Sequence, residues 1–244
     1  MPTPRLEHSH RPVDIASRLA GTPRASYLRD WIYGGIDGAV TTFAIVAGSV
    51  GAALSAKTIL ILGVANLLAD GFSMAAANYS GTKSEEEDYA RLLSIEEKHL
   101  DLAPEGEREE IRQIFRSKGY SGRDLEELVR LVTSNRATWI ETMMQAEYGL
   151  SSTARSPVQA ALATFTAFLV CGSLPLLPFL AGSGSSEVQT TVLTAAAFFL
   201  IGSIKSRWST KNWLLSGLET TGIGLCAAGI AYLAGALLHS LIAG

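Results

Sequence analysis

The charged residues of this chain are concentrated in one internal stretch, and this segregation constrains the fold more than any other feature. Of the 23 acidic residues, 16 lie between residues 83 and 155, together with 11 of the 20 basic residues. The flanking stretches are long and apolar, and the whole chain is only 18% charged, against about 25% in typical soluble domains. This layout predicts an all-α, polytopic membrane protein whose transmembrane helices flank a charged insert.

Five segments are long and apolar enough to cross a bilayer, because a spanning helix needs about 20 predominantly apolar residues. They are residues 31–56, 59–79, 158–181, 188–206 and 213–242. No proline occurs from Ile59 to Ala103, so the second span can continue into the insert as one helix. The predicted domains are an N-terminal segment (1–30), spans one and two (31–82), the insert (83–156) and spans three to five (157–244).

Loop charge predicts the orientation, since cytoplasmic flanks of spans collect lysine and arginine. With the N-terminus inside, 19 of the 20 basic residues lie on one side of the membrane, and only Lys57 lies on the other. We therefore expect the N-terminal segment and the insert in the cytoplasm. The odd number of spans then puts the C-terminus outside.

The insert is predicted to be helical, because its apolar residues recur at three- and four-residue steps. Pro104, Lys118–Gly119 and Ser134–Asn135 divide it into three helices. Several potential metal ligands share helix faces within it: Glu96 with His99, Glu107 with Glu110, and Met143 and Met144 with Glu147. Carboxylates, an imidazole and thioethers together favour Fe²⁺, Mn²⁺, Co²⁺ or Zn²⁺. Spacing alone also allows the methionines to be core residues.

Ionisable side chains inside the predicted spans form the second candidate site, because a charge in the bilayer is costly and usually functional. Asp37 lies in span one, and Asp70 and Met74 share a face of span two with Asn66 and Asn78. Carboxylates with a thioether suit a transition metal better than calcium or magnesium. The alternative is that these groups only tie helices together by hydrogen bonds.

Four motifs in order along the chain resemble the vacuolar iron transporter family, in its bacterial branch. They are LRDWIYGGIDG at 28–38, LADGFSMA at 68–75, WIETMMQAEYGL at 139–150 and SGLE at 216–219. The resemblance implies a homodimer of five-span subunits in the cell inner membrane, with a three-helix cytoplasmic metal-binding domain and a metal path near the subunit interface. It also implies export of Fe²⁺, and often Mn²⁺, in exchange for protons.

The resemblance also assigns roles to individual residues. Asp37 and Met74 match the family's metal path in the membrane. The positions that match the domain ligands are Glu96, Glu107, Glu110, Met143, Met144 and Glu147. His99 departs from the family pattern, which has a second glutamate there; its imidazole still binds transition metals but lacks the negative charge.

Three functions fit these features. The first is a secondary-active metal exporter, not an enzyme, with metal ions and protons as substrates, no prosthetic group and no nucleic-acid partner. The second is a membrane-anchored, ferritin-like iron oxidase, since Glu96 and His99 form a Glu-x-x-His motif; a di-iron bundle needs two such motifs on its core helices, and the insert has one. The third is a metal sensor or scaffold that binds metal without moving it.

Overall fold

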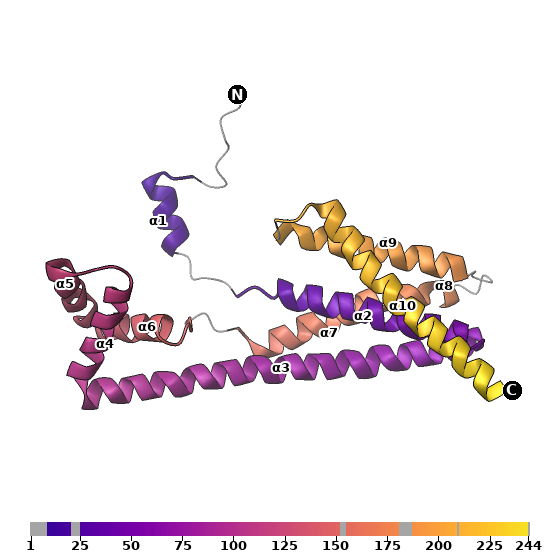
Figure 1. Cartoon of the computed structure of the whole chain (residues 1–244), viewed down its shortest axis with the longest axis horizontal. Helices are drawn as coiled ribbons and strands as arrows, with labels where there is room; N and C mark the ends of the chain where they lie inside the picture. The colour runs from indigo at the N-terminus through magenta and orange to yellow at the C-terminus, as the bar shows by residue number, and fades with distance from the viewer. Residues whose placement is uncertain (1–8, 21–24, 152–154, 181–186, 209, 244) are drawn as a thin grey trace, which may run out of the picture. The chain divides into compact units, whose positions relative to one another are not determined.

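The computed structural model of the chain describes residues 9–20, 25–151, 155–180, 187–208 and 210–243 (Figure 1). All regular secondary structure in these ranges is helical, with no strand among them, which confirms the predicted all-α class. The chain divides into two compact units. One comprises Tyr27–Ala90 and Arg155–Gly244, and the other comprises Met1–Ser26 and Arg91–Ala154.

Within the described residues, five helical segments are long and apolar enough to span a bilayer, as the sequence predicted. They are α2 (Leu28–Gly51), α3 (Ala56–Leu102), the segment formed by α7 (Pro157–Ser173), η1 (Leu174–Leu176) and α8 (Leu177–Leu180), α9 (Glu187–Lys205) and α10 (Trp213–Ala243). A short 3-10 turn, η2 (Ser206–Trp208), follows α9. Helix α3 is 47 residues long without a break, so the second span does continue into the insert.

The span boundaries differ from the predicted ones where turns override hydropathy. Helix α2 ends at Gly51 rather than at residue 56, because Ala53 adopts a left-handed conformation (φ 53°). The Oγ of Ser55 then accepts a hydrogen bond from the backbone N–H of Thr58 (3.2 Å) and caps the start of α3. In the third span, Pro175 lies in the 3-10 turn η1 that interrupts the helix. The predicted end of that span, Ala181, lies outside the described residues.

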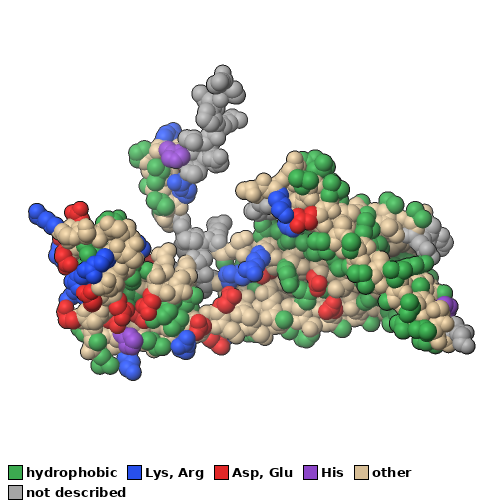
Figure 2. Space-filling view, in the orientation of Figure 1, with side chains coloured by type: hydrophobic (Ala, Val, Ile, Leu, Met, Phe, Trp, Pro, Cys, Tyr) green, Lys and Arg blue, Asp and Glu red, His purple; other side chains and the backbone are tan. Residues whose placement is uncertain are grey.

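The spanning helices pack closely because small residues line their contacts. A Cβ atom at Gly34 or Gly38 of α2 would collide with the backbone of α7 at Thr164 or Phe168. Two apolar clusters fill the interior of this unit. The outer surface is also apolar, as Figure 2 shows in green, and only 6% of the most apolar stretch of α10 is buried. That surface suits a lipid environment.

The other unit contains α1 (Pro12–Ala20), the C-terminal end of α3, α4 (Pro104–Ser117), α5 (Gly122–Thr133) and α6 (Arg136–Ala146). We call the part from Arg91 to Ala154 the insert domain. Its helices begin and end at the predicted breaks: Pro104 starts α4, Gly119 has a φ of 95°, and the side chain of Asn135 caps α6. Its apolar core comprises Leu100, Ile111, Leu125, Val129, Trp139 and Met143. Charged side chains gather on its surface (Figure 2).

Candidate metal-binding sites

Three side chains of the insert domain lie close enough together to hold one metal ion. Glu96 and His99 share a face near the end of α3, and Glu107 lies in the first turn of α4. One potential ligand atom from each of the three lies within 4.8 Å of the other two. The Nδ1 atom of His99 is 3.4 Å from Oε1 of Glu107. The chain reverses direction where α4 begins at Pro104, and so brings Glu107 of α4 next to Glu96 and His99 of α3.

The two glutamates of this cluster are buried without a full set of partners. Glu96 is 1% exposed and Glu107 is 4% exposed. Among the described residues, neither Oε2 of Glu96 nor Oε2 of Glu107 has a hydrogen-bond partner. Burying such an oxygen unpaired is costly, and a cation between the two carboxylates would remove the cost. With the adjacent imidazole, these atoms form a donor set that suits a divalent transition metal.

Two further predicted ligands, Glu110 and Glu147, interact with this cluster electrostatically. Burial, followed by the charges of Glu110 and Glu96, raises the pKa of Glu107 to about 7. Burial and the charge of Glu147 raise the pKa of Glu110, and Glu96 adds to that shift. His99 acts on both groups in the opposite direction. Four carboxylates thus repel one another around one imidazole, an arrangement that a bound cation would stabilise.

The two methionines predicted as ligands are both buried, at 0% exposure for Met143 and 1% for Met144. Met143 packs in the apolar core with Ile111 and Val129. Met143 is therefore a core residue, which is one of the two roles that spacing alone had left open. A ligand role for either sulfur stays a prediction.

Tyr148 is a polar neighbour of the cluster that the sequence did not single out. Its hydroxyl donates a hydrogen bond to Oε1 of Glu96 (2.8 Å). Burial and its hydrogen bonds to Glu96 and Glu147 raise the pKa of Tyr148, so the hydroxyl keeps its proton and remains a donor. The only sequence signal for this role is its place within the motif at 139–150.

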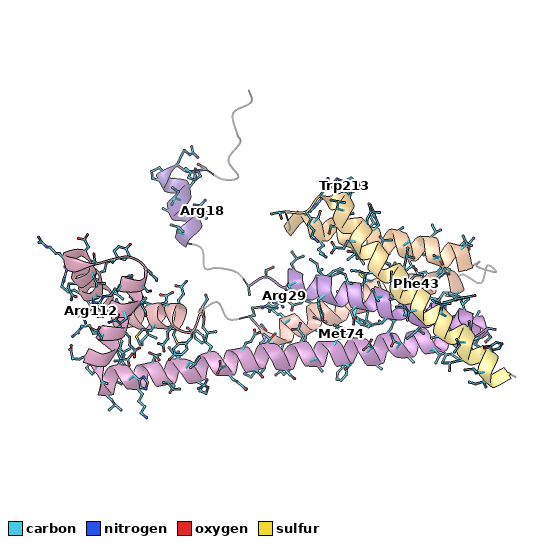
Figure 3. All side chains as sticks on the ribbon, viewed as in Figure 1. Arg18, Arg29, Phe43, Met74, Arg112 and Trp213 are labelled. Carbon is cyan, nitrogen blue, oxygen red and sulfur yellow. The ribbon has the colours of Figure 1, made fainter. Side chains whose placement is uncertain are left out.

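The unit formed by Tyr27–Ala90 and Arg155–Gly244, which we call the membrane unit, brings its predicted site residues together on α2 and α3. Asp37, Asp70 and Met74 are all half-buried. The carboxylates of Asp37 and Asp70 are close enough to interact electrostatically. Met74, labelled on α3 in Figure 3, lines a cavity of about 420 Å³ together with Asp30 and Tyr33. A metal path through these positions is compatible with this arrangement and stays a prediction.

An ion pair that lines the same cavity was not apparent from the sequence. Arg155 pairs with Asp30, which is 5% exposed, and its guanidinium lies 5.8 Å from the ring centre of Tyr27. The side-chain amide of Asn78 donates to Asp30 Oδ1 (2.9 Å) and to Thr164 Oγ1 (2.7 Å). Asn78 thus ties α2, α3 and α7 together, which favours the hydrogen-bonding interpretation for that residue. The sequence alone assigns no role to either residue of the pair: Asp30 lies within the motif at 28–38, and Arg155 lies in the loop before span three.

Comparison with known proteins finds one family model, described as the VIT family, that matches residues 28–236. Similar proteins include the "Vacuolar iron transporter" of Toxoplasma gondii, 32% identical over 98% of this chain and 84% of that protein. The "Vacuolar iron transporter 1" of Arabidopsis thaliana is 32% identical over 84% of this chain and 83% of its own length. The "Vacuolar iron transporter" of Plasmodium falciparum is 27% identical over 88% and 83%, respectively.

Proposed function

The chain belongs to the VIT family, and from this premise we propose that it exports Fe²⁺, and also Mn²⁺, from the cytoplasm in exchange for protons. The relatives are named as iron transporters, which supports iron as a substrate. The observation that carries the proposal is the Glu96, His99 and Glu107 cluster, with its two buried and unpartnered carboxylate oxygens. The protein would act as a secondary-active transporter rather than an enzyme.

In this proposal the insert domain captures the metal. Glu96, His99 and Glu107 supply the first ligands, and the surrounding acids supply further negative charge. The complete proposed ligand set is Glu96, His99, Glu107, Glu110, Met143, Met144 and Glu147. An imidazole and carboxylates also bind Zn²⁺ or Co²⁺, so these ions would occupy the same site.

The metal then crosses the bilayer past Asp37, Asp70 and Met74. A divalent ion neutralises two adjacent carboxylates, and protons would neutralise them after its release, which couples metal and proton movement. The three side chains are only half-buried in a single chain. Ionisable groups in a membrane avoid lipid, which supports a second copy covering this face and a path near the interface of a homodimer.

The proposed orientation follows the distribution of basic residues. The N-terminal segment and residues 83–156 would lie in the cytoplasm and the C-terminus outside, in the cell inner membrane. Metal captured by the insert domain would then enter the path from the cytoplasmic side.

Flux measurements on the full chain in proteoliposomes test the proposal. We expect Fe²⁺ and Mn²⁺ uptake that increases with a pH gradient and is lost in Asp37→Ala and strongly reduced in Met74→Ala. The matched control is Glu219→Gln: this acid also lies in a span, but it is paired with Lys211 (2.8 Å) and should leave flux unchanged. Flux that survives Asp37→Ala would disprove the membrane path.

The same preparation separates the alternatives. Oxygen consumption on adding Fe²⁺ would favour the oxidase, whose second Glu-x-x-His motif the insert lacks. Metal binding with no flux under any gradient would favour the sensor or scaffold.

A further inference from the structure

Helix α1, which no site described so far involves, has two chemically distinct faces. At 100° per residue, Pro12, Val13, Ile15, Ala16, Leu19 and Ala20 all fall on one side of its wheel. The opposite side carries only Asp14, Ser17 and Arg18. A continuous apolar stripe on one side of so short a helix is typical of a segment that lies flat on another surface.

Most of the apolar face of α1 is exposed, and only Ile15 of that face is half-buried. The helix has no buried residue, and Val13 and Leu19 are 78% and 74% exposed. A helix of nine residues is only marginally stable by itself in water. Its apolar face therefore needs a partner surface to stabilise the helix.

Charge indicates which surface this is. The N-terminal segment, residues 1–30, carries five arginines against three acids, Glu7, Asp14 and Asp30. Asp14 is already paired, since its Oδ2 atom lies 2.7 Å from Nε of Arg11. Arg18, labelled in Figure 3, stands at the edge of the polar face, where a basic side chain can reach lipid phosphates while the apolar face enters the acyl region. The excess positive charge complements anionic lipid headgroups.

Chain connectivity supports the same surface. The first membrane span, α2, begins at Leu28, only eight residues after Ala20. An extended chain covers at most about 3.5 Å per residue, so α1 is tethered within roughly 28 Å of a span that enters the bilayer. Such a tether gives a high effective concentration, and weak contacts then suffice for binding.

From these observations we propose that α1 is an interfacial helix that lies on the membrane surface and binds anionic lipid headgroups. Its apolar face, which includes Val13, Ala16 and Leu19, enters the bilayer interface. Arg18 contacts the headgroups, while Arg11 and Asp14 neutralise each other. This inference depends on membrane insertion of the chain and not on metal transport.

Amide hydrogen exchange of the full chain in nanodiscs tests the proposal. Residues 13–20 should exchange roughly fivefold more slowly in phosphatidylcholine discs that contain phosphatidylglycerol than in discs of phosphatidylcholine alone, because one arginine near an anionic surface contributes about 1 kcal/mol. Leu19→Asn should abolish the slowing. Ser17→Asn introduces the same side chain on the polar face of the same helix and should preserve it. Arg18→Gln should reduce only the part that depends on phosphatidylglycerol.

The other outcomes would overturn the proposal. Equal protection in both kinds of disc would show that α1 does not recognise anionic headgroups. Fast exchange in every preparation would show that α1 has no docking surface. Equal loss of protection in Leu19→Asn and Ser17→Asn would show that the apolar face is not the one that binds.

Discussion

The two units of this protein bury carboxylates in opposite ways. In the membrane unit, Asp30 is 5% exposed, and its two oxygens contact Arg155 and Asn78. In the insert domain, Glu96 and Glu107 are buried at least as deeply, yet each retains one oxygen without a partner among the described residues. Asp30 therefore has the environment of a structural group. Glu96 and Glu107 have the environment of ligands whose missing partner is a cation.

The partners of a buried carboxylate, and not its burial alone, decide whether it stabilises the protein. A buried acid with a complete set of partners stabilises the packing around it, and its replacement leaves those partners unpaired. A buried acid that faces other acids destabilises the protein until a cation binds. Removing charge should therefore have opposite effects on stability in the two units.

The largest expected effect is on the ion pair between Arg155 and Asp30. Arg155→Met leaves the buried Asp30 without a counter-charge. Because Arg155 itself is 27% exposed, we expect a loss at the lower end of the range, about 3–5 kcal/mol, that breaking a fully buried pair costs. The midpoint of thermal unfolding of the full chain in detergent, followed by tryptophan fluorescence, should fall clearly. Adding Asp30→Asn to this variant should restore part of the loss.

Arg136→Met is the matched control for that experiment. Arg136 pairs with Asp101 (2.6 Å), but the two side chains are 51% and 63% exposed. Exposed pairs contribute at most about 1 kcal/mol, so the midpoint should hardly move. Equal shifts for both variants would contradict the structural role given to Asp30.

In the insert domain, neutralising Glu107 should stabilise the metal-free protein while it removes metal binding. The pKa of Glu107 is raised from 4.5 to about 7, so the folded state disfavours its charged form by on the order of 3 kcal/mol above pH 7. Glu107→Gln should raise the unfolding midpoint measured with a chelator at pH 8. It should lower Mn²⁺ or Co²⁺ affinity in calorimetric titrations by more than about 100-fold, the upper range for loss of a group that only supports a ligand.

Glu109→Gln provides the control on the same helix. Its side chain is exposed and hydrogen-bonded to Gln113 and Arg112, and these bonds lower the pKa of Glu109. The substitution should change neither the chelated unfolding midpoint nor metal affinity. A Glu107→Gln protein that is destabilised like Arg155→Met would break the distinction between the two units.

The architecture was largely predictable from the sequence because it depends on local properties. Hydropathy identified the five spans, and the proline-free stretch indicated that α3 continues past the second span. The turn after Gly51 was missed because apolar residues continue through it. Its position depends on the conformation of Ala53 and the cap at Ser55, which hydropathy does not report.

The candidate sites were predictable only within single helices. Spacing placed Glu96 beside His99 on one face, but it could not identify Glu107 as their neighbour without the family resemblance. The partners that hold the carboxylates were missed, because Arg155 is 125 residues from Asp30 and Tyr148 is 52 residues from Glu96. Such contacts are set by tertiary packing, and no periodicity in the sequence encodes them.

The folding stability and the metal affinity of the insert domain should both depend on pH, because the pKa of Glu107 is raised. Because folding raises the pKa of Glu107 to about 7, the metal-free folded state binds more protons than the unfolded state between pH 4.5 and 7. Stability contributed by this group should therefore increase as pH falls through 7 and level off near 4.5. Metal must displace the same proton, so affinity should fall up to about tenfold per pH unit below 7.

Calorimetric titration of the full chain with Mn²⁺ at several pH values measures this slope. Glu110, whose pKa is also raised, should add to it. Glu110→Gln should therefore make the slope shallower but leave a residual decline below pH 7. An affinity that does not change between pH 8 and 6 would contradict the raised pKa of Glu107.

The smallest expected effect concerns the hydrogen bond that Tyr148 donates to Oε1 of Glu96. Tyr148→Phe removes only the hydroxyl that donates to Glu96 Oε1, so the carboxylate is free to rotate. Loss of such a supporting hydrogen bond typically costs 10- to 100-fold in metal affinity, and a single neutral donor predicts the lower end, about tenfold. The visible spectrum of bound Co²⁺ should shift as well, because Oε1 becomes available to the metal. Tyr120→Phe, an exposed tyrosine in the same unit, should change neither quantity. Unchanged affinity and spectrum in Tyr148→Phe would show that packing alone orients Glu96. The Oε2 atoms of Glu96 and Glu107, unpartnered among the described residues, would then be the only feature that distinguishes these carboxylates from the paired Asp30.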